Sequence, residues 1–510
     1  LTAAQTRRLV SGTAGLIAVT VLWPGVTRGA FVAGGPDPYG YVSQASLWLT
    51  GIPRMALPQV GVLPDGVPLE ALVPLGYRLG TNGASLVPAY SPGFPMQMAL
   101  MERLGPQDSM FFVLPVLAAV AVWATYLLGT MLAGRAAGMI AALFLATSPA
   151  FDIQLTHMPM SDIPAMAWWT VALVLLPRSS RISALLAGAA VGAAILTRPN
   201  LAPLTLVLGA FLVWDVTANR VARAVAIQRV LLFGIGSVSA CLTVAYLNNY
   251  WYGSPLASGY EPLADLYGRD YFWPNVTDYM RRLLDSQGPL VFVAAAGPAF
   301  LWRNRANRRD TVGQRSILVA CTAFAIGVYL CYAFYVPLDT WWTLRFLFPA
   351  FPVAFVFLGV ALLNLPASLP APARWLSVLV LVGTTVAHAV AFGHANAVSD
   401  STPERRYATA GRYIAQRMPE RAVFFSMLHA GSARYYSGRL TVRYDLIPPQ
   451  LIERTIVHFQ QQGFVPFLLL DDGERGHFVD RFTGATSLAA LDWQPVATLD
   501  GVAIYDVTAK

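Results

Sequence analysis

The sequence contains few charged residues. Asp, Glu, Lys and Arg make up only 12% of its 510 residues and 56% are hydrophobic, whereas soluble domains carry roughly 25% charged residues. A chain so poor in charge cannot cover the surface of a soluble globule, so we predict a membrane protein. The formal net charge of +8 does not indicate nucleic-acid binding, because the excess Lys and Arg lie mostly in short loops between apolar segments, where membrane topology explains them.

Cysteine is also scarce. The three cysteines, Cys241, Cys321 and Cys331, fall within apolar runs. Cys321 and Cys331 would lie about 15 Å apart along a helix, which is too far for a disulfide. No spacing typical of metal ligands surrounds them, so we interpret all three as small, buried, hydrophobic side chains.

Apolar stretches of membrane-spanning length, roughly 17–25 residues, recur along most of the chain. The first, Leu9 to Trp23, follows Arg7-Arg8 and lacks a small-residue cleavage site, so we expect a retained first span. The sequence predicts an α-helical polytopic membrane protein with about 11 transmembrane helices. They are predicted near residues 9–28, 109–131, 136–151, 162–177, 182–197, 200–214, 229–250, 289–302, 316–336, 346–364 and 374–392.

The basic residues predict how these helices are oriented. If the N-terminus is cytoplasmic, alternate loops should be rich in Lys and Arg. The predicted cytoplasmic segments contain Arg7-Arg8, Arg135, Arg178, Arg181, Arg220, Arg223, Arg229, the stretch from Arg303 to Arg315, and Arg374. The same alternation places residues 29–108, residues 251–288 and the C-terminal tail on the extracytoplasmic side. In the first of these loops, Tyr39 to Thr50 is predicted to form an amphipathic helix at the membrane surface.

The tail has an ordinary density of charged and polar residues. Helices are predicted over 404–418, 432–437 and 450–462, and strands over 422–427, 440–444, 465–470 and 502–507. Alternating helices and strands indicate a small α/β domain with a partly parallel sheet. No glycine-rich phosphate-binding fingerprint follows a strand, so we assign no nucleotide to it. We therefore predict a transmembrane domain over residues 1–395 and a soluble α/β domain over residues 396–510.

Two acidic residues stand out on the predicted extracytoplasmic side. Asp37 follows the first span and precedes Pro38. It can be a helix N-cap with proline at the first helical position, a general base at the mouth of a membrane cavity, or both, since a capped helix start can also orient a carboxylate. Asp162 opens the fourth span, where Ser161 is a competing cap. Local sequence leaves both alternatives open for both residues.

Two arginines on the same side run against the positive-inside bias. Arg345 opens the tenth span beside Trp341 and Trp342, so it is either a snorkelling anchor or a ligand for phosphate, which guanidinium geometry suits. Arg198 has the same alternatives, and the anchor is the simpler one. His157 is interpreted first as a hydrogen-bonded loop residue and only second as a ligand.

Taken in order, these motifs resemble those of the GT-C superfamily of glycosyltransferases, and most of all glycosyltransferase family 39 and the lipid A aminoarabinose transferases. The matching residues are Asp37, Tyr41 and Gly51; Tyr90 to Pro95 (Tyr-x-Pro-Gly-aromatic-Pro); Ser161 to Pro164 (Ser-Asp-x-Pro); Arg198 to Asn200 (Arg-Pro-Asn); and Arg345 to Pro349 (Arg-aromatic-x-x-Pro). The resemblance covers residues 9–395. Protein mannosyltransferases tend to have two adjacent acidic residues in the first loop, whereas Asp37 is followed by Pro38, so the sequence departs from that subgroup.

The resemblance implies an activity. A sugar would pass, with inversion, from a polyprenyl-phosphate-linked donor to a hydroxyl of an envelope glycan, lipid or protein. Asp37 and Asp162 would be the catalytic residues, Asp37 as the general base and Asp162 as a cavity or metal-assisting group, while Arg345 and Arg198 would bind the donor phosphate. The substrate cavity would be lined by Tyr41, Tyr90, His157 and Tyr260. No cofactor is required, and a divalent cation held by Asp37 and Asp162 is left open.

The resemblance also implies a location, the bacterial inner or plasma membrane, with the N-terminus cytoplasmic and the C-terminal domain extracytoplasmic. The partners would be the lipid-linked donor, the acceptor and membrane lipids, and no nucleic acid. A transporter or flippase of lipid-linked sugars is one alternative, although no internal repeat is detectable. A non-catalytic envelope scaffold is another. The enzyme hypothesis requires Asp37, Asp162 and Arg345 to face one water-filled chamber open to the outer leaflet.

Overall fold

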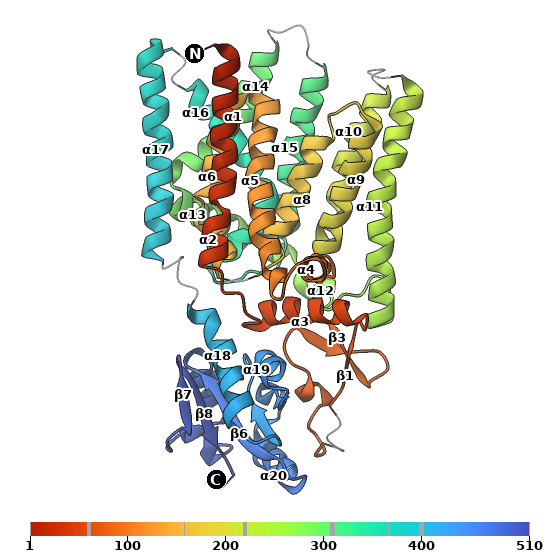
Figure 1. Cartoon of the computed structure of the whole chain (residues 1–510), viewed down its shortest axis with the longest axis vertical. Helices are drawn as coiled ribbons and strands as arrows, with labels where there is room; N and C mark the ends of the chain where they lie inside the picture. Colours follow the sequence, from red (N-terminus) through yellow and green to blue (C-terminus); the bar gives the residue numbers. More distant parts are fainter. Residues whose placement is uncertain are drawn as a thin grey trace. The chain divides into compact units, whose positions relative to one another are not determined.

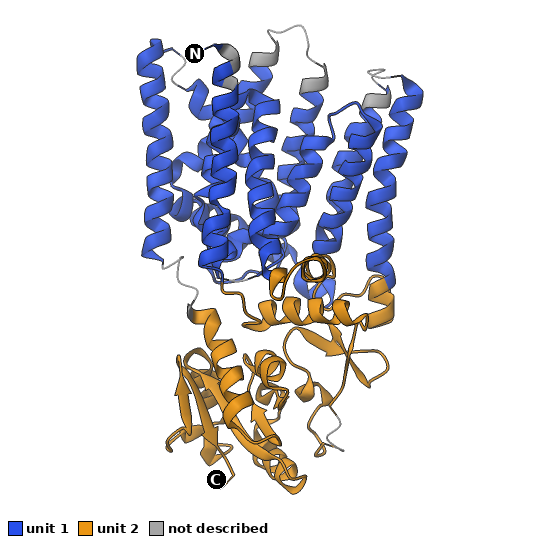
Figure 2. Ribbon diagram, viewed as in Figure 1, with its two compact units in different colours: residues 1–29, 111–246, 261–400 blue, residues 30–110, 247–260, 401–510 orange. Residues whose placement is uncertain are grey.

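The computed structural model describes residues 2–58, 63–157, 159–217, 222–306, 312–365, 368–396 and 402–508 (Figure 1). The chain forms two compact units, each assembled from three stretches of sequence (Figure 2). Unit 1 comprises Leu1–Gly29, Phe111–Tyr246 and Glu261–Asp400, and unit 2 comprises Ala30–Met110, Leu247–Tyr260 and Ser401–Lys510. The first predicted loop thus folds with the tail. The division into domains over 1–395 and 396–510 stays a prediction.

Unit 1 is a bundle of helices that lie side by side (Figure 1). Its α-helices are α1 (Ala3–Thr20), α2 (Leu22–Thr27), α5 (Val113–Ala133), α6 (Arg135–Ala146), α7 (Pro149–Thr156), α8 (Asp162–Leu175), α9 (Arg181–Thr197), α10 (Thr205–Thr217), α11 (Arg223–Tyr252), α12 (Leu263–Leu266), α13 (Phe272–Gln287), α14 (Gly297–Ala306), α15 (Val312–Ala333), α16 (Phe351–Asn364) and α17 (Ala371–Ala395). Shorter 3-10 helices are η3 (Pro199–Leu204), η4 (Arg269–Tyr271), η5 (Pro289–Ala296) and η6 (Trp341–Ala350). The last turns of α11 belong to unit 2.

Among the described residues, six helical segments are long and apolar enough to cross a membrane: Arg8–Thr27, Ser109–Ala133, Arg223–Tyr252, Arg315–Ala333, Trp341–Asn364 and Ala371–Ala395. The pair α6 and α7, bent by 53°, passes the same test together. Four shorter apolar helices are Asp162–Leu175, Arg181–Thr197, Pro199–Trp214 and Pro289–Arg303. Each predicted span overlaps one of these segments. The number of crossings and their orientation stay predictions.

Burial separates the inner helices of unit 1 from the outer ones. In the most apolar window of Trp341–Asn364, 83% of residues are buried, against 22% for Ala371–Ala395. The segment containing α16 is therefore the interior of the bundle, and α17 is peripheral. Helix α11 likewise leaves apolar residues uncovered, and Cys241 on it is exposed. The prediction that all three cysteines are buried is wrong for Cys241, because among the described residues most of the apolar window of α11 is left uncovered.

Small residues allow two of the helices to approach closely. A Cβ atom added to Gly188 of α9 would lie 2.2 Å from the carbonyl oxygen of Phe233 in α11. A Cβ atom added to Gly236 of α11 would lie 2.3 Å from the carbonyl carbon of Gly188. Glycine is required at both positions because the obstructing atoms belong to the backbone, as is usual where membrane helices cross at small residues.

We expect Gly236→Val to destabilise the bundle, because the added side chain would push α9 and α11 apart. Overpacking typically costs about 1–3 kcal/mol. The measurement is the thermal unfolding temperature of the purified protein in detergent. Gly234→Val is the matched control, since Gly234 lies on the same helix and has no atom within 4 Å of an added Cβ. Equal shifts in both variants would contradict the close approach.

Unit 2 begins with a helix and a small antiparallel sheet. Helix α3 (Pro36–Thr50) is followed by strands β1 (Met55–Ala56), β2 (Tyr77–Leu79) and β3 (Ser85–Pro88), which lie in the order β1-β3-β2, and then by α4 (Gly93–Leu104). The 3-10 helices η1 (Leu69–Leu72) and η2 (Ser109–Phe112) complete the segment. The predicted helix over 39–50 is present, but its consecutive residues from Pro38 to Ala45 are all buried. The first half of α3 is therefore a core helix, not an amphipathic one.

The tail forms a five-stranded sheet in the order β5-β4-β6-β8-β7. Its strands are β4 (Ala422–Phe425), β5 (Leu440–Val442), β6 (Val465–Asp471), β7 (Ala497–Leu499) and β8 (Val502–Asp506). Strand β4 is parallel to β5 and β6, while β8 is antiparallel to β6 and β7. Its helices are α18 (Thr402–Arg417), α19 (Ala430–Ser437), α20 (Ile452–Gln461) and α21 (Asp472–Phe482), with short η7 (Tyr444–Leu446), η8 (Pro449–Leu451) and η9 (Ser487–Ala490). The sequence did not predict α21 or β7.

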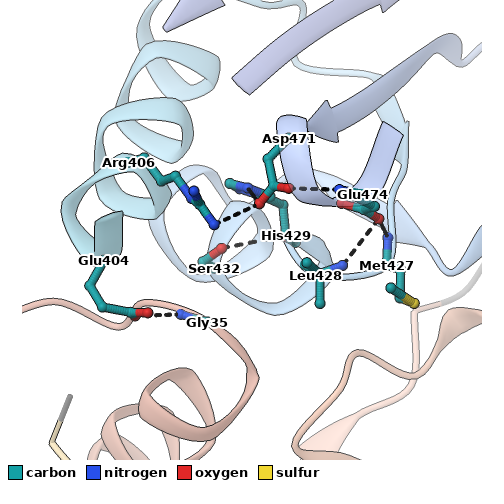
Figure 3. A network of polar contacts seen from close by, with 9 residues as sticks. All are labelled: Gly35, Glu404, Arg406, Met427, Leu428, His429, Ser432, Asp471 and Glu474. Atoms are coloured by element: carbon teal, nitrogen blue, oxygen red, sulfur yellow. Dashed lines mark hydrogen bonds and ion pairs between the residues drawn. The ribbon is translucent and has the colours of Figure 1, made fainter. Parts of the chain in front are cut away.

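A network of polar side chains is buried where the parallel strands β4 and β6 end (Figure 3). The carboxylate of Asp471 lies 3.0 Å from the Arg406 guanidinium and 3.4 Å from His429 Nε2. The side chains of Asp471 and His429 are fully buried. Polar groups are common at the carboxyl ends of parallel strands. Here the polar side chains connect α18, the start of α19 and the end of β6.

Glu474 is the second buried acid of this network. Its carboxylate accepts hydrogen bonds from the backbone N–H groups of Met427 and Leu428, and its own N–H donates to Asp471 Oδ1 at 2.9 Å. Burial raises the pKa of the Glu474 carboxyl to about 7, although the hydrogen bond from Met427 opposes the shift. The ionised form of Glu474 therefore disfavours the folded state.

We expect the stability of the tail to fall as the pH rises from about 4.5 to above 7. In the unfolded chain a glutamate loses its proton near pH 4.3, so between the two pKa values the folded state binds more protons, and the contribution lost is roughly 3–4 kcal/mol. Thermal unfolding measured across this range should show the slope, and Glu474→Gln should flatten it. Glu420→Gln, at an exposed position of the same unit, should leave the slope as it is. A slope that persists in Glu474→Gln would contradict the assignment.

Candidate active site

Asp37 lies in the first turn of α3. Gly35 is the N-cap and Pro36 the first helical residue, so Asp37 occupies the second position. The interpretation of Asp37 as an N-cap followed by Pro38 at the first position is therefore wrong. The partly exposed carboxylate accepts a hydrogen bond from the Tyr90 hydroxyl. This places a carboxylate at the positive end of a helix, with its orientation set by a tyrosine.

Tyr90 can reach Asp37 because α3 has no side chain at Gly40. A Cβ atom at Gly40 would lie 2.2 Å from the Tyr90 ring. Burial, and then the nearby Asp37 carboxylate, raise the pKa of the Tyr90 hydroxyl well above its usual value, so this hydroxyl keeps its proton and remains the donor. Sequence reasoning missed Gly40, although a lone glycine inside a helical pattern signals close approach of another group.

Two further predicted cavity residues lie beside Tyr90. The Tyr41 ring centre is 4.8 Å from that of Tyr90, and the Tyr260 ring, 43% exposed, is 6.0 Å away in an edge-on arrangement. Tyr260 is held there because Gly259 packs against the backbone, where an added Cβ would lie 2.2 Å from the Ala89 carbonyl oxygen. The structure thus brings together Asp37, Tyr41, Tyr90 and Tyr260 within unit 2.

Asp162 and Arg198 form a buried ion pair in unit 1. Asp162 is the first residue of α8, and Arg198 lies between α9 and η3. The guanidinium Nη2 is 2.7 Å from Asp162 Oδ1, and the two side chains are 14% and 0% exposed for Arg198 and Asp162. Arg198 also donates to the hydroxyl of Tyr332 at 2.8 Å. The positive charge of Arg198 is therefore matched by a carboxylate that has no exposed surface.

Arg345 lies beside the ring of Phe346, which Arg198 also contacts. The guanidinium carbons of Arg345 and Arg198 each lie 5.3 Å from the centre of the Phe346 ring, which stacks on Tyr332 with centroids 5.0 Å apart. Both arginines therefore share one aromatic side chain. Arg345 additionally contacts the sulfur atom of Met160.

His157 ends α7, and its Nδ1 lies 3.2 Å from the hydroxyl oxygen of Thr156. Within the described residues no three His, Cys, Asp or Glu side chains form a group that could hold a metal ion. The requirement that Asp37, Asp162 and Arg345 face one chamber stays a prediction, since Asp37 belongs to unit 2 and the other two residues to unit 1.

Comparison with known proteins shows what the chain is similar to. The model of the dolichyl-phosphate-mannose-protein mannosyltransferase family matches residues 90–243, less than half of the chain. Solved structures of two proteins cover nearly all of it. The Archaeoglobus fulgidus oligosaccharyltransferase in complex with Zn and sulfate is 15% identical, with a TM-score of 0.61, over 97% of this chain and 73% of that one. ArnT from Cupriavidus metallidurans bound to undecaprenyl phosphate is 14% identical, with a TM-score of 0.57, over 99% and 98%.

The chain has the fold of these GT-C proteins. At these identities the likeness to the solved structures establishes the fold. The archaeal oligosaccharyltransferase AglB has also been solved in complex with an inhibitory peptide and a dolichol-phosphate, and it is 13% identical with a TM-score of 0.55 over 98% of this chain and 74% of that one. A comparison with curated protein sequences found no match.

We expect Asp162→Asn to destabilise the protein strongly, because it leaves a largely buried guanidinium without its counter-charge. Breaking a buried pair costs about 3–5 kcal/mol. Asp152→Asn is a matched comparison, since Asp152 pairs with Arg28 at 3.2 Å but both side chains are partly exposed, and such pairs contribute at most about 1 kcal/mol. Thermal unfolding in detergent measures both. A smaller loss for Asp162→Asn than for Asp152→Asn would contradict the buried pairing.

Proposed function

We propose that this protein is a membrane glycosyltransferase that moves a sugar from a polyprenyl-phosphate carrier to a hydroxyl of an envelope acceptor. The observation that carries the proposal is the Asp37 carboxylate, partly exposed and oriented by Tyr90 at the start of α3, in a chain with the GT-C fold. The family match over residues 90–243 supports it. Further support comes from the solved neighbours, one bound to undecaprenyl phosphate and one to a dolichol-phosphate.

In the proposed reaction Asp37 is the general base. Its carboxylate takes the proton from the acceptor hydroxyl as the hydroxyl oxygen attacks the anomeric carbon of the sugar. The bond between that carbon and the phosphate oxygen breaks, and the polyprenyl phosphate leaves with the bonding electrons. Attack from the side opposite the leaving group inverts the configuration. The hydrogen bond from Tyr90 holds the carboxylate in a fixed orientation for this transfer.

Arg345 is the first candidate for binding the donor phosphate. The charge of Arg198 is already matched by the buried Asp162, so we assign Arg198 a supporting part and Asp162 the part of holding Arg198 in place. A guanidinium near the leaving phosphate stabilises the negative charge that develops there. Phe346, in contact with both arginines, ties the positions of the two cations together.

In this proposal the remaining predicted residues contact the substrate. Tyr41, Tyr90 and Tyr260 offer aromatic faces beside Asp37. His157, in unit 1, is proposed as a substrate-contacting residue on the basis of the resemblance. A divalent cation, if the reaction uses one, would bind Asp37, because the Asp162 carboxylate has no exposed surface. Such an ion would neutralise charge on the phosphate.

We place the protein in the bacterial inner membrane with this chemistry on the extracytoplasmic side.

We expect Asp37→Asn to lower kcat by about 10²–10⁴-fold, because general-base catalysis contributes that much and an amide cannot take the proton. The assay uses protein in liposomes with a panel of undecaprenyl-phosphate sugars (mannose, glucose, galactose and arabinose) and an envelope extract as acceptor, and measures release of undecaprenyl phosphate. Asp65→Asn, at an exposed position of the same loop, should retain full activity. Unchanged turnover in Asp37→Asn would remove the proposed base.

A further inference from the structure

The segment that leads into α3 is held by the tail. The N–H of Ala33 donates to the Tyr436 hydroxyl of α19 at 2.7 Å, and the N–H of Gly35 donates to Glu404 Oε2 of α18 at 3.0 Å (Figure 3). All four residues belong to unit 2, although nearly 400 residues of sequence separate each pair. Both bonds are made immediately before the turn of α3 that carries Asp37.

Helix α3 also packs directly on α19. A Cβ atom added to Gly431 of α19 would lie 2.2 Å from the Tyr39 ring, and the Tyr435 ring lies 6.4 Å from that of Tyr39. Tyr39 is only 2% exposed. The tail therefore contacts Tyr39, two residues after Asp37, and also Gly35, two residues before it.

Gly35 is the residue through which the tail acts on the start of α3. As the N-cap, it accepts the first hydrogen bond of the helix, from the N–H of Tyr39 at 2.9 Å. Its own N–H is taken by Glu404. The N-cap determines where a helix begins, so the tail, by binding the Gly35 N–H through Glu404, fixes the start of α3 and with it the direction in which Asp37 leaves the backbone.

We propose that the C-terminal α/β domain positions the Asp37 carboxylate, and that Glu404 is the positioning residue. The inference rests on the proposed function, since it assigns Asp37 the part of the base. Glu404 does not contact the reacting atoms; it acts through the backbone of Gly35. Its anchor is the tail itself, because Arg406, two residues further along α18, is bonded to Asp471 at the end of β6. The tail is thereby part of the machinery that sets the reaction rate.

Glycine at position 34 is explained by the same contact. A Cβ atom at Gly34 would lie 2.0 Å from Glu404 Oε2, the atom that accepts from Gly35. Gly34→Ala would therefore displace the Glu404 carboxylate and break its bond to Gly35 without changing any charge. Both this substitution and Glu404→Ala remove the hydrogen bond between Gly35 and Glu404. Gly34→Ala displaces the acceptor, and Glu404→Ala deletes it.

The test compares Glu404→Ala, Glu404→Gln, Gly34→Ala and the double variant Gly34→Ala/Glu404→Ala. Glu420→Ala and Gly476→Ala are matched controls, because both positions are exposed in the same unit and an added Cβ at Gly476 has no atom within 4 Å. Two readouts are taken on the full-length protein. Hydrogen–deuterium exchange of the peptide over residues 30–41 reports on the Gly35 amide, and the undecaprenyl-phosphate release assay gives kcat and the donor KM.

We expect Glu404→Ala and Gly34→Ala to raise amide exchange in that peptide about fivefold or more. Both should lower kcat by about 10- to 100-fold, as expected for misplacing a catalytic group by a fraction of an ångström to an ångström, with the donor KM within about twofold of wild type. Glu404→Gln keeps an oxygen acceptor for Gly35 and should retain most of kcat. The double variant should be no slower than Glu404→Ala, because the two changes remove one shared interaction.

Two results would overturn the inference. One is unchanged exchange over residues 30–41 in both single variants, whatever their activity. The other is increased exchange with wild-type kcat while Asp37→Asn is inactive, which leaves the proposed function standing and removes only the positioning part. Full activity of Asp37→Asn would instead overturn the proposed function itself. If Glu404→Ala fails to fold, Gly34→Ala, which leaves Glu404 and its charge in place, still decides the outcome.

Discussion

The start of α3 is the constraint on which the candidate site depends. A helix N-terminus exposes N–H groups and a partial positive charge, and here the Gly35 N–H is taken by Glu404 while Tyr90 binds Asp37. Neither contact is local in sequence. Gly34 and Gly40 make room for the incoming side chains, so the position of one carboxylate depends on residues from three distant segments.

In unit 1, buried charged side chains have partners within the protein. A charged group inside an apolar bundle is costly unless a partner accompanies it. Asp162 is paired with Arg198, and Arg229, which is 2% exposed, donates to the Leu176 carbonyl oxygen at 2.8 Å. Motifs that stand out in the sequence as polar groups at membrane depth are thus already compensated within the protein. Arg198 and Arg345 share Phe346, and the guanidinium of Arg198 lies 2.7 Å from Asp162.

Much of the secondary structure followed from composition and periodicity. Each predicted span overlaps an apolar helix, because long runs without charge have few alternatives to helix in a membrane. In the tail, strands β4, β5, β6 and β8 lie close to their predicted ranges. Helix α21 was missed because its sequence, DGERGHFVDRF, is polar and contains two glycines. The N-cap of α3 was misplaced by two residues, since both Asp37 and Gly35 precede a proline and local sequence favours the aspartate.

The sequence by itself determined that this chain is a helical membrane protein with an α/β tail, and it identified the residues worth examining. Those properties depend on hydrophobicity summed over many residues, which a single sequence records. Only the tertiary structure decided that the first loop folds with the tail, that Asp162 pairs with Arg198, and that Glu404 accepts a hydrogen bond from Gly35, the N-cap of α3. Such pairings depend on the directions of individual side chains across long sequence separations, and no periodicity or local spacing encodes them.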